Sequence, residues 1–262
     1  MNQNITKAIL PLAALSCVHG KMLAQDAARP NILYIMCDDH AMQAISAYGS
    51  PISKLAPTPN IDRLAQRGML FRNCFVENSL STPSRACLMT GLYSHQNGQR
   101  QLAEGIDTTK TFVPELMQKA GYETGIVGKW HMMCRPKGFD YYYILDGQGK
   151  YYNPNFCTTG NYGKYKQEMG YATTLTTQHA IEFLDHRQKG KPFCLYVHHK
   201  APHRSWFAEP KHIGMYDGVD FPLPKTFWDN YENRGSAAKT QKMNIEKDME
   251  LILDFKIPEL LD

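Results

Sequence analysis

The 262-residue sequence contains no Cys-x-x-Cys pair, no internal repeat and no run of five or more Lys and Arg residues. Without a Cys-x-x-Cys pair, a structural zinc site or a thioredoxin-type redox role has no support. The net charge is only +4, from 29 basic and 25 acidic residues, which argues against nucleic acid as a partner. No internal apolar stretch approaches the roughly 18 residues of a membrane span. We therefore expect no nucleic acid partner and no membrane span.

The composition is that of a globular protein, since 43% of the residues are apolar and 21% are charged. The length suggests one or two domains with a sizeable core. Six of the seven cysteines follow the first 25 residues and are spread widely along the chain. We expect most of them to be small core residues rather than a disulfide framework.

The N-terminal segment has the features of a secretory signal peptide. Lys7 precedes an apolar run at residues 8–18, and small and polar residues follow this run. We predict a signal peptide at residues 1–25 and a periplasmic or secreted domain at residues 26–262. A lipoprotein anchor at Cys17 stays open as an alternative.

Short β-rich runs alternate with helical patterns along the rest of the chain. Strands are predicted at residues 31–37, 69–76, 124–127 and 192–198. Helices are predicted at residues 58–68, after Pro83, and at residues 113–120 and 176–186. This alternation predicts an α/β sandwich with a mostly parallel sheet. Such sheets bind ligands beyond the carboxyl ends of their strands, so the residues that follow each strand are candidate site residues.

Three finer expectations concern burial. Residues 31–37 are nearly all apolar, which is typical of a strand buried on both faces. In the first helix, Ile61, Leu64 and Ala65 form the expected inner face. Residues 141–171 are rich in Tyr, Asn, Gly and Lys, which suggests a long excursion over the surface.

Asp38 and Asp39 directly follow the first predicted strand. Two adjacent carboxylates repel each other unless a cation or hydrogen-bond donors neutralise them. Oxygen ligands of this kind suit a hard cation such as calcium or magnesium. The alternative is a polar loop whose carboxylates cap a helix.

Residues 81–91 read Ser-Thr-Pro-Ser-Arg-Ala-Cys-Leu-Met-Thr-Gly. This segment resembles the signature of the type I sulfatases, in which the first residue is converted into formylglycine. Ser81 in place of Cys resembles the serine-type bacterial members, which are matured by a radical enzyme. The resemblance implies that modified Ser81 is the nucleophile of a sulfate ester hydrolase.

The local chemistry agrees with this resemblance. Pro83 favours a helix start, which places Ser81 near the positive end of the helix dipole, where anions are stabilised. Arg85 lies one turn further and can counter negative charge on the nucleophile. An unmodified serine alcohol has a pKa too high for attack on a sulfate ester. An aldehyde hydrate supplies one hydroxyl to attack sulfur and a second to expel sulfate.

Two further segments carry the resemblance. Residues 128–131 read Gly-Lys-Trp-His, and by resemblance Lys129 contacts the sulfate while His131 hydrogen-bonds the formylglycine hydroxyl. Many sulfatases carry His-x-Pro-His after a later strand, whereas this chain has Lys200 in the first His position and His203 in the second. We assign the general acid to His203, because histidine is the residue type best suited to exchange a proton near neutral pH, and sulfate binding to Lys200.

Residues 147–154 and 200–204 most resemble the bacterial N-acetylglucosamine-6-sulfatases, which act on mucin or heparan-type glycans. The resemblance implies an alkaline-phosphatase-like fold, a sulfated glycan substrate, a formylglycine-generating maturase as partner, and calcium bound by Asp38, Asp39 and modified Ser81. The family's later Asp-Asn-Gly segment and C-terminal domain are not found, so we expect a C-terminally truncated sulfatase domain. Calcium takes six to eight oxygen ligands, so these three residues alone make a poor site.

Two alternatives stay open. The first is a phosphatase or phosphonate hydrolase of the same superfamily, which uses unmodified Ser81 with transition metals. The second is an inactive fragment that at most binds sulfated glycan.

Overall fold

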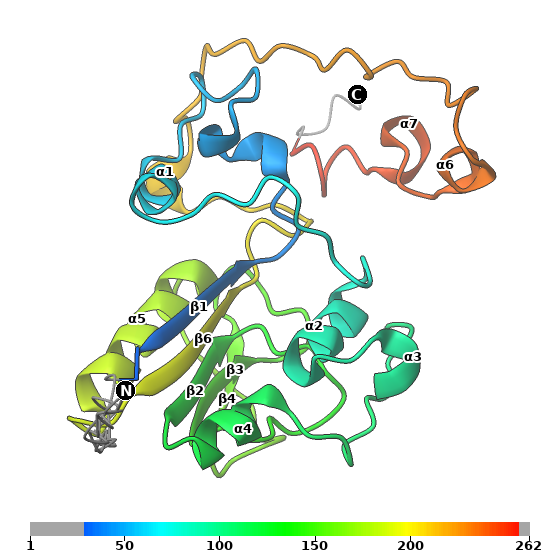
Figure 1. Cartoon of the computed structure of the whole chain (residues 1–262). Coiled ribbons are helices and arrows are strands. Elements are labelled where there is room, and N and C mark those ends of the chain that lie inside the picture. Colours follow the sequence, from blue (N-terminus) through cyan, green and yellow to red (C-terminus); the bar gives the residue numbers. More distant parts are fainter. Residues whose placement is uncertain (1–28, 257–262) are drawn as a thin grey trace, which may run out of the picture. The chain divides into compact units, whose positions relative to one another are not determined.

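The computed structural model describes residues 29–256, and the architecture below is that of the unit that begins at Asn31. Its centre is a six-stranded sheet with the order β1-β6-β2-β3-β4-β5 (Figure 1). The strands are β1 (Ile32–Cys37), β2 (Glu123–Gly128), β3 (Tyr141–Leu145), β4 (Asn155–Thr158), β5 (Lys166–Gln167) and β6 (Phe193–His199). Strands β1, β6, β2 and β3 pair in parallel, whereas β4 and β5 extend the sheet in antiparallel fashion. The predicted α/β fold with a mostly parallel sheet is confirmed.

Seven α-helices are found in the described part of the chain. They are α1 (Pro59–Arg67), α2 (Ser81–Thr90), α3 (Ser94–Asn97), α4 (Val113–Lys119), α5 (Ala172–His186), α6 (Ser236–Thr240) and α7 (Ile245–Asp248). Short 3₁₀ helices lie at Met42–Ala44, Ser46–Tyr48 and Pro210–His212. None of the helices in residues 29–256 combines the length and apolar character that a membrane span requires. The expected signal peptide lies outside the described residues.

Side chains from both faces of the sheet form the core. On one face, Ile126 of β2 and Tyr196 of β6 pack in a cluster with Ala86 and Met89 of α2. On the other face, the alternate β2 residue Val127 packs with β6 side chains and with α5. This alternation follows from the opposite directions of successive side chains along a strand. Helices therefore cover both faces of the parallel strands, as sheets of this class require.

The strand predicted at residues 69–76 is wrong. This segment is irregular, and Phe75 is 85% exposed. Its apolar and aromatic side chains suit a strand, but β-propensity takes effect only where a neighbouring strand and a core are in place. In the described part of the chain, β1 pairs with β6 alone and no strand adds to its other side. Ser81 therefore follows an irregular segment rather than a strand.

The burial predictions for β1 and α1 are also wrong. Strand β1 lies at the edge of the sheet, and Leu33 and Ile35 are half exposed. Helix α1 has the predicted bounds but no buried side chain, and Leu64 is 65% exposed. An apolar pattern indicates which face of a helix or strand can be buried. Whether that face is buried depends on another helix or strand that packs against it. No described residue covers these faces fully.

Residues 141–171 are not the predicted surface excursion. They contain β3, β4 and β5, and Tyr142, Phe156 and Cys157 are buried. The short antiparallel strands carry Tyr and Asn beside their apolar residues, so the composition of the segment does not identify them as strands. Helix α5 also begins at Ala172, one turn before its predicted start.

Candidate active site

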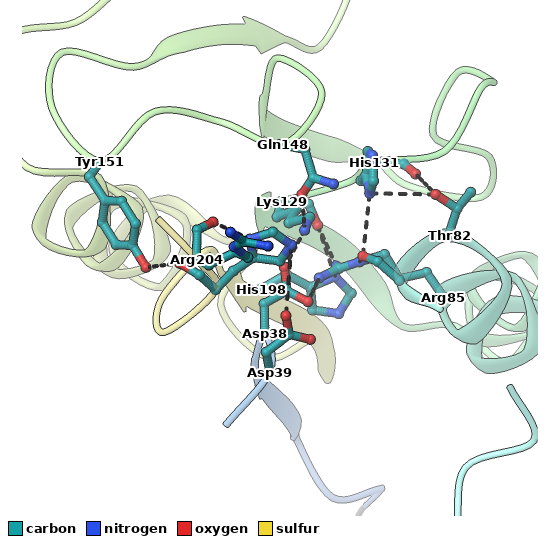
Figure 2. A network of polar contacts seen from close by, with 12 residues as sticks. Asp38, Asp39, Thr82, Arg85, Lys129, His131, Gln148, Tyr151, His198 and Arg204 are labelled. Atoms are coloured by element: carbon teal, nitrogen blue, oxygen red, sulfur yellow. Dashed lines mark hydrogen bonds and ion pairs between the residues drawn. The ribbon is translucent and has the colours of Figure 1, made fainter. Parts of the chain in front are cut away.

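The carboxyl ends of three adjacent parallel strands bring the predicted site residues together. Asp38 follows β1, Lys129 follows β2 and Lys200 follows β6, which lies between the other two. These residues are far apart in sequence, yet the strand order places them at one edge of the sheet. Figure 2 shows Asp38, Lys129 and Arg85 converging at this edge. The position agrees with the general location of ligands in open α/β sheets.

Gly128 allows β2 and β6 to approach closely just before Lys129. Its φ is +91°, and an added Cβ would lie 2.1 Å from the His198 carbonyl oxygen. The Lys129 backbone N–H donates to that same oxygen at 2.7 Å. A side chain at this position would therefore separate the strand ends and displace Lys129.

Lys129 has no exposed surface, and its ammonium group donates to the carboxylate of Asp38 and to Oε1 of Gln148. Burial lowers its pKa to about 8, although the negative charge of Asp38 acts in the opposite direction. Each charge of this buried pair has a partner of opposite sign, which offsets part of the cost of removing both from water. Lys129 therefore stays mostly cationic at neutral pH.

Arg85 connects the two charged residues to Ser81. Its Nε donates to the Ser81 hydroxyl at 3.4 Å, Nη1 donates to the Lys129 carbonyl at 2.7 Å, and Nη2 lies 3.6 Å from Asp38 Oδ1. Burial lowers the pKa of Arg85 to about 10, and it remains a cation at neutral pH. Arg85 and Lys129 thus place two positive charges beside the N-terminus of α2, an arrangement that favours an anion.

Ser81 is the first residue of α2, and Pro83 lies within the first turn, where a missing N–H is tolerated. The His131 Nδ1 atom lies 3.3 Å from the Ser81 hydroxyl oxygen (Figure 2). Burial, together with the positive charges of Lys129 and Arg85, lowers the pKa of His131 to about 4. His131 is therefore neutral at pH 7, and its ring nitrogen can accept a proton or a hydrogen bond from a group at position 81.

His203 and Asp39 lie beside this network. The His203 Nε2 atom is 3.7 Å from Asp39 Oδ2, and the His203 backbone N–H donates to the Lys200 carbonyl at 3.0 Å. Asp39 is 62% exposed on its side chain and has a φ of +60°. The Lys200 ammonium nitrogen lies 5.0 Å from the centre of the Tyr151 ring. Burial lowers the pKa of Lys200, while the charges of Asp38 and Asp39 raise it.

The sequence analysis did not assign a role to three residues of this network. Gln148 accepts from Lys129, and the Tyr151 hydroxyl donates to the His203 carbonyl at 2.6 Å. Both lie in the 147–154 segment that carried a family resemblance, which was the available signal. His198 was left as structural, yet its Nδ1 lies 3.0 Å from Arg85 Nη1. Nothing in the sequence places its ring against Arg85.

His198 Nδ1 lies 3.0 Å from Arg85 Nη1 and 3.2 Å from the Lys129 carbonyl oxygen, which already accepts from Arg85 Nη1 at 2.7 Å. A guanidinium group cannot accept a hydrogen bond, so we assign Nδ1 as an acceptor from Arg85. This assignment puts the ring proton on Nε2, which is buried and has no hydrogen-bond partner among the described residues. Burial and the charge of Arg85 lower the pKa of His198 well below its ordinary value. His198 is thus a neutral acceptor that fixes the plane of Arg85.

The residues around Ser81 line a cavity of about 610 Å³ that includes Asp38, Asp39 and Arg85. Within residues 29–256, no group of three or more His, Cys, Asp or Glu side chains is arranged to hold a metal ion. Asp38 is engaged by Lys129, which leaves few free oxygens for calcium. The described residues alone do not fit a calcium site, whereas their positive charges fit a sulfate-sized anion.

Comparison with known proteins identifies the family of this chain. The family model named Sulfatase matches residues 30–244. The chain belongs to the sulfatase family. It is 44% identical to an N-acetylglucosamine-6-O-sulfatase of Bacteroides thetaiotaomicron, over 98% of this chain and 46% of that protein. It is 31% identical to the human N-acetylgalactosamine-6-sulfatase, over 88% of this chain and 48% of that protein.

Solved structures support the same assignment and the alkaline-phosphatase-like fold. A protein in complex with its substrate D-glucosamine-2-N,6-O-disulfate matches with a TM-score of 0.83 and 46% identity, over 88% of this chain and 46% of that chain. A protein crystallised with k-i-k-neocarrahexaose matches with a TM-score of 0.64 and 30% identity, over 74% of this chain and 49% of that chain. The sulfatase chain described here thus spans about half the length of the relatives it matches.

Proposed function

We propose that this sulfatase hydrolyses sulfate esters of sulfated glycans, with N-acetylglucosamine-6-sulfate as the favoured substrate, after conversion of Ser81 to formylglycine. The observation that carries the proposal is the position of Ser81. It begins α2, within 3.4 Å of a cationic Arg85 and 3.3 Å of a neutral His131. The 44% identity to an N-acetylglucosamine-6-O-sulfatase supports the choice of sugar.

Formylglycine at position 81 would supply a hydrated aldehyde, in which one hydroxyl attacks sulfur and the other later expels sulfate. Arg85 and His131 both lie within hydrogen-bond distance of the Ser81 oxygen, so the surroundings of Ser81 fit this modification. Arg85 and Lys129 hold the negative charge of the sulfate group, which increases on its non-bridging oxygens as the ester bond breaks. His131 is neutral and can accept the proton that the nucleophile releases.

His203 is the proposed general acid. It lies on the segment after β6, and its Nε2 faces the carboxylate of Asp39 at 3.7 Å. This contact orients the His203 ring beside Asp39, which lines the same cavity as Ser81. Its backbone is held in place by the Lys200 carbonyl and by the Tyr151 hydroxyl.

We also propose that calcium binds Asp38, Asp39 and modified Ser81. These three residues do not complete the coordination of the ion. Two carboxylates and one further oxygen fall short of the six to eight oxygens that calcium takes. Additional ligands would have to come from outside the described residues. The proposed roles of Arg85, Lys129 and His131 do not require the ion.

A second candidate function is binding of sulfated glycan without turnover. Two observations favour it: Asp38 is already neutralised by Lys129, and the chain covers only 46% of its N-acetylglucosamine-6-O-sulfatase relative. A phosphatase that uses unmodified Ser81 is less well supported, since no cluster of His and carboxylate ligands is found in residues 29–256.

The test is co-expression with a serine-type maturase, followed by peptide mass spectrometry and an assay of sulfate release from N-acetylglucosamine-6-sulfate. A peptide lighter by about 2 Da at Ser81, with sulfate release, is the expected result. Ser81→Ala is the control that cannot be modified. Modification without release, but with binding of the sugar, would favour the second candidate function. An unmodified Ser81 together with phosphate release from phosphate esters would overturn the proposal.

A further inference from the structure

The segment that carries His203 is attached to a distant part of the chain by an ion pair. Arg204, the next residue, donates from Nε to Oδ1 of Asp254 at 3.0 Å, and its Nη2 donates to Oδ2 of the same carboxylate. The Asp254 side chain has no exposed surface, whereas that of Arg204 is 30% exposed. Two parallel hydrogen bonds between a guanidinium and a carboxylate fix the orientation of both groups. Arg204 is therefore held by a residue 50 positions away in sequence.

The carboxylate of Asp254 is itself held in place. Its Oδ2 accepts from the backbone N–H of Glu250 at 2.9 Å, and the Asp254 N–H donates to the Glu250 carbonyl at 2.8 Å. The hydrogen bonds from Arg204 and Glu250 lower the pKa of Asp254, so the carboxylate is ionised at neutral pH. A second contact joins the same two parts of the chain, because the Lys256 ammonium nitrogen lies 3.7 Å from the centre of the Phe207 ring. Residues 250–256 thus anchor the segment that follows β6.

Arg204 also determines which nitrogen of His203 is turned toward Asp39. The His203 Nδ1 atom is hydrogen-bonded to the Arg204 carbonyl oxygen. A carbonyl oxygen can only accept, so Nδ1 carries a proton and donates. The other ring nitrogen, Nε2, lies 3.7 Å from Asp39 Oδ2. The position of the Arg204 backbone therefore sets both the tautomer and the orientation of the His203 ring.

The other restraints on His203 act on its backbone. The Tyr151 hydroxyl donates to the His203 carbonyl, and Figure 2 shows Tyr151 directing this hydroxyl at the segment that carries Arg204. Among the described residues, the His203 ring makes hydrogen bonds or ion pairs with Arg204 and Asp39 alone. The Asp39 side chain is 62% exposed. The Arg204 carbonyl is therefore the better fixed of the two partners of the ring.

We propose that Asp254 is a positioning residue for the general acid: through Arg204, it holds the His203 ring so that Nε2 delivers a proton to the leaving sugar oxygen. That proton passes from the protonated ring to the bridging oxygen as the bond between this oxygen and sulfur breaks. Asp254 takes no part in the transfer and touches no substrate. The inference rests on the proposed function and adds a residue that lies outside the motifs of the family resemblance.

The first measurement compares two sulfate esters with maturase-treated protein. N-acetylglucosamine-6-sulfate releases an alcohol that needs a proton, whereas 4-nitrophenyl sulfate releases a phenolate that does not. Asp254→Asn should lower kcat for the sugar ester about tenfold, because a misplaced general acid loses part of its effect, and should leave KM and turnover of the aryl ester unchanged. Arg204→Lys keeps the charge but loses the paired geometry, so its loss should be intermediate. Equal losses on both esters, or no loss on either, would overturn the inference.

Asp229→Asn is the matched control. Asp229 also pairs with one guanidinium and one backbone amide, since it accepts from Arg234 Nη2 at 2.7 Å and from the Tyr231 N–H at 2.8 Å. Neither partner is adjacent to a site residue. The control should leave the turnover of both esters unchanged, and urea unfolding should show that both Asn variants are folded. If Asp254→Asn does not fold, Arg204→Lys alone decides between loss on the sugar ester and loss on both esters.

The second measurement does not depend on turnover. Long-range ¹H–¹⁵N NMR spectra of protein with ¹⁵N-labelled histidine distinguish the two tautomers of a neutral ring, and the spectrum of His203→Gln identifies the His203 signals. In mildly alkaline buffer, wild-type His203 should be a single Nδ1–H tautomer, and Asp254→Asn should show a mixture. A mixture in the wild type, or an unchanged tautomer in Asp254→Asn, would overturn the inference. The expected change of tautomer without any sulfate release by the wild type would instead contradict the proposed function and leave the contact between Asp254 and the His203 segment established.

Discussion

Replacement of Gly128 by Ala should strongly destabilise the domain. The new Cβ would lie 2.1 Å from the His198 carbonyl oxygen and 2.8 Å from Cγ2 of Thr176. The first neighbour is backbone of β6, which cannot move away without shifting the strand. The φ of +91° adds a conformational penalty of about 1 kcal/mol for any residue with a side chain.

Three contributions set the expected loss in the free energy of unfolding. Overpacking of a rigid site costs about 1–3 kcal/mol. Loss of the Lys129 N–H to His198 carbonyl hydrogen bond adds about 1 kcal/mol. Together with the backbone penalty, the expected loss is about 3–5 kcal/mol, a large fraction of the 5–15 kcal/mol that holds a typical domain folded.

Urea unfolding followed by circular dichroism measures this loss as a shift of the transition midpoint. Gly190→Ala is the matched control, because Gly190 has a similar φ of +85° but no atom within 4 Å of an added Cβ. The control should lose only about 1 kcal/mol. If Gly128→Ala and Gly190→Ala are equally destabilised, the close approach of β2 and β6 at Lys129 is not what makes glycine necessary, and the reasoning fails.

Three further predictions concern the site. Ser81→Ala should abolish sulfate release from maturase-treated protein without a change in the unfolding midpoint, and a lower midpoint would instead assign Ser81 a structural role. His198→Leu should weaken binding of inorganic sulfate about tenfold, because Arg85 loses its hydrogen-bond acceptor. His198→Asn keeps an acceptor near the Nδ1 position and should recover most of the affinity. Unchanged sulfate binding in His198→Leu would mean that His198 acts only through packing. The pKa of His198 is lowered in the folded state, so the unfolded chain binds more protons in acid. The contribution of His198 to the free energy of unfolding should therefore be complete above about pH 6.5 and decline as the pH falls below it. When urea midpoints are compared across this range, the decline should be smaller in His198→Leu.

Local sequence was sufficient to identify most of the candidate site residues. Ser81 and Arg85 lie one helical turn apart, so their proximity follows from the geometry of α2 alone. The Gly-Lys-Trp-His segment placed Lys129 at a strand end, and the structure brings it to Asp38, 91 residues away. The parallel strands at residues 32–37, 123–128 and 193–199 were also predictable, since each is a short apolar run next to a helical pattern.

The errors share one cause, which is that pairing and burial depend on partners distant in sequence. Residues 69–76 have the side chains of a strand but no neighbouring strand, and β1 has the side chains of a central strand but lies at the edge. Conversely, residues 141–171 lack a clear apolar pattern, yet β3 gains its partner from β2 and extends the sheet. Propensity is a property of a segment, whereas a sheet is a property of several segments together.

The sequence by itself determined the family and the fold class and indicated the candidate site residues, because motif residues stand at fixed spacings along a helix or strand. Only the tertiary structure decided that Arg85 is held by His198, that Gln148 accepts from Lys129, and that Lys200 lies over Tyr151. Each of these contacts joins segments that meet at the carboxyl edge of the sheet. These contacts depend on the spatial order of the strands in the sheet, and no local sequence pattern encodes that order.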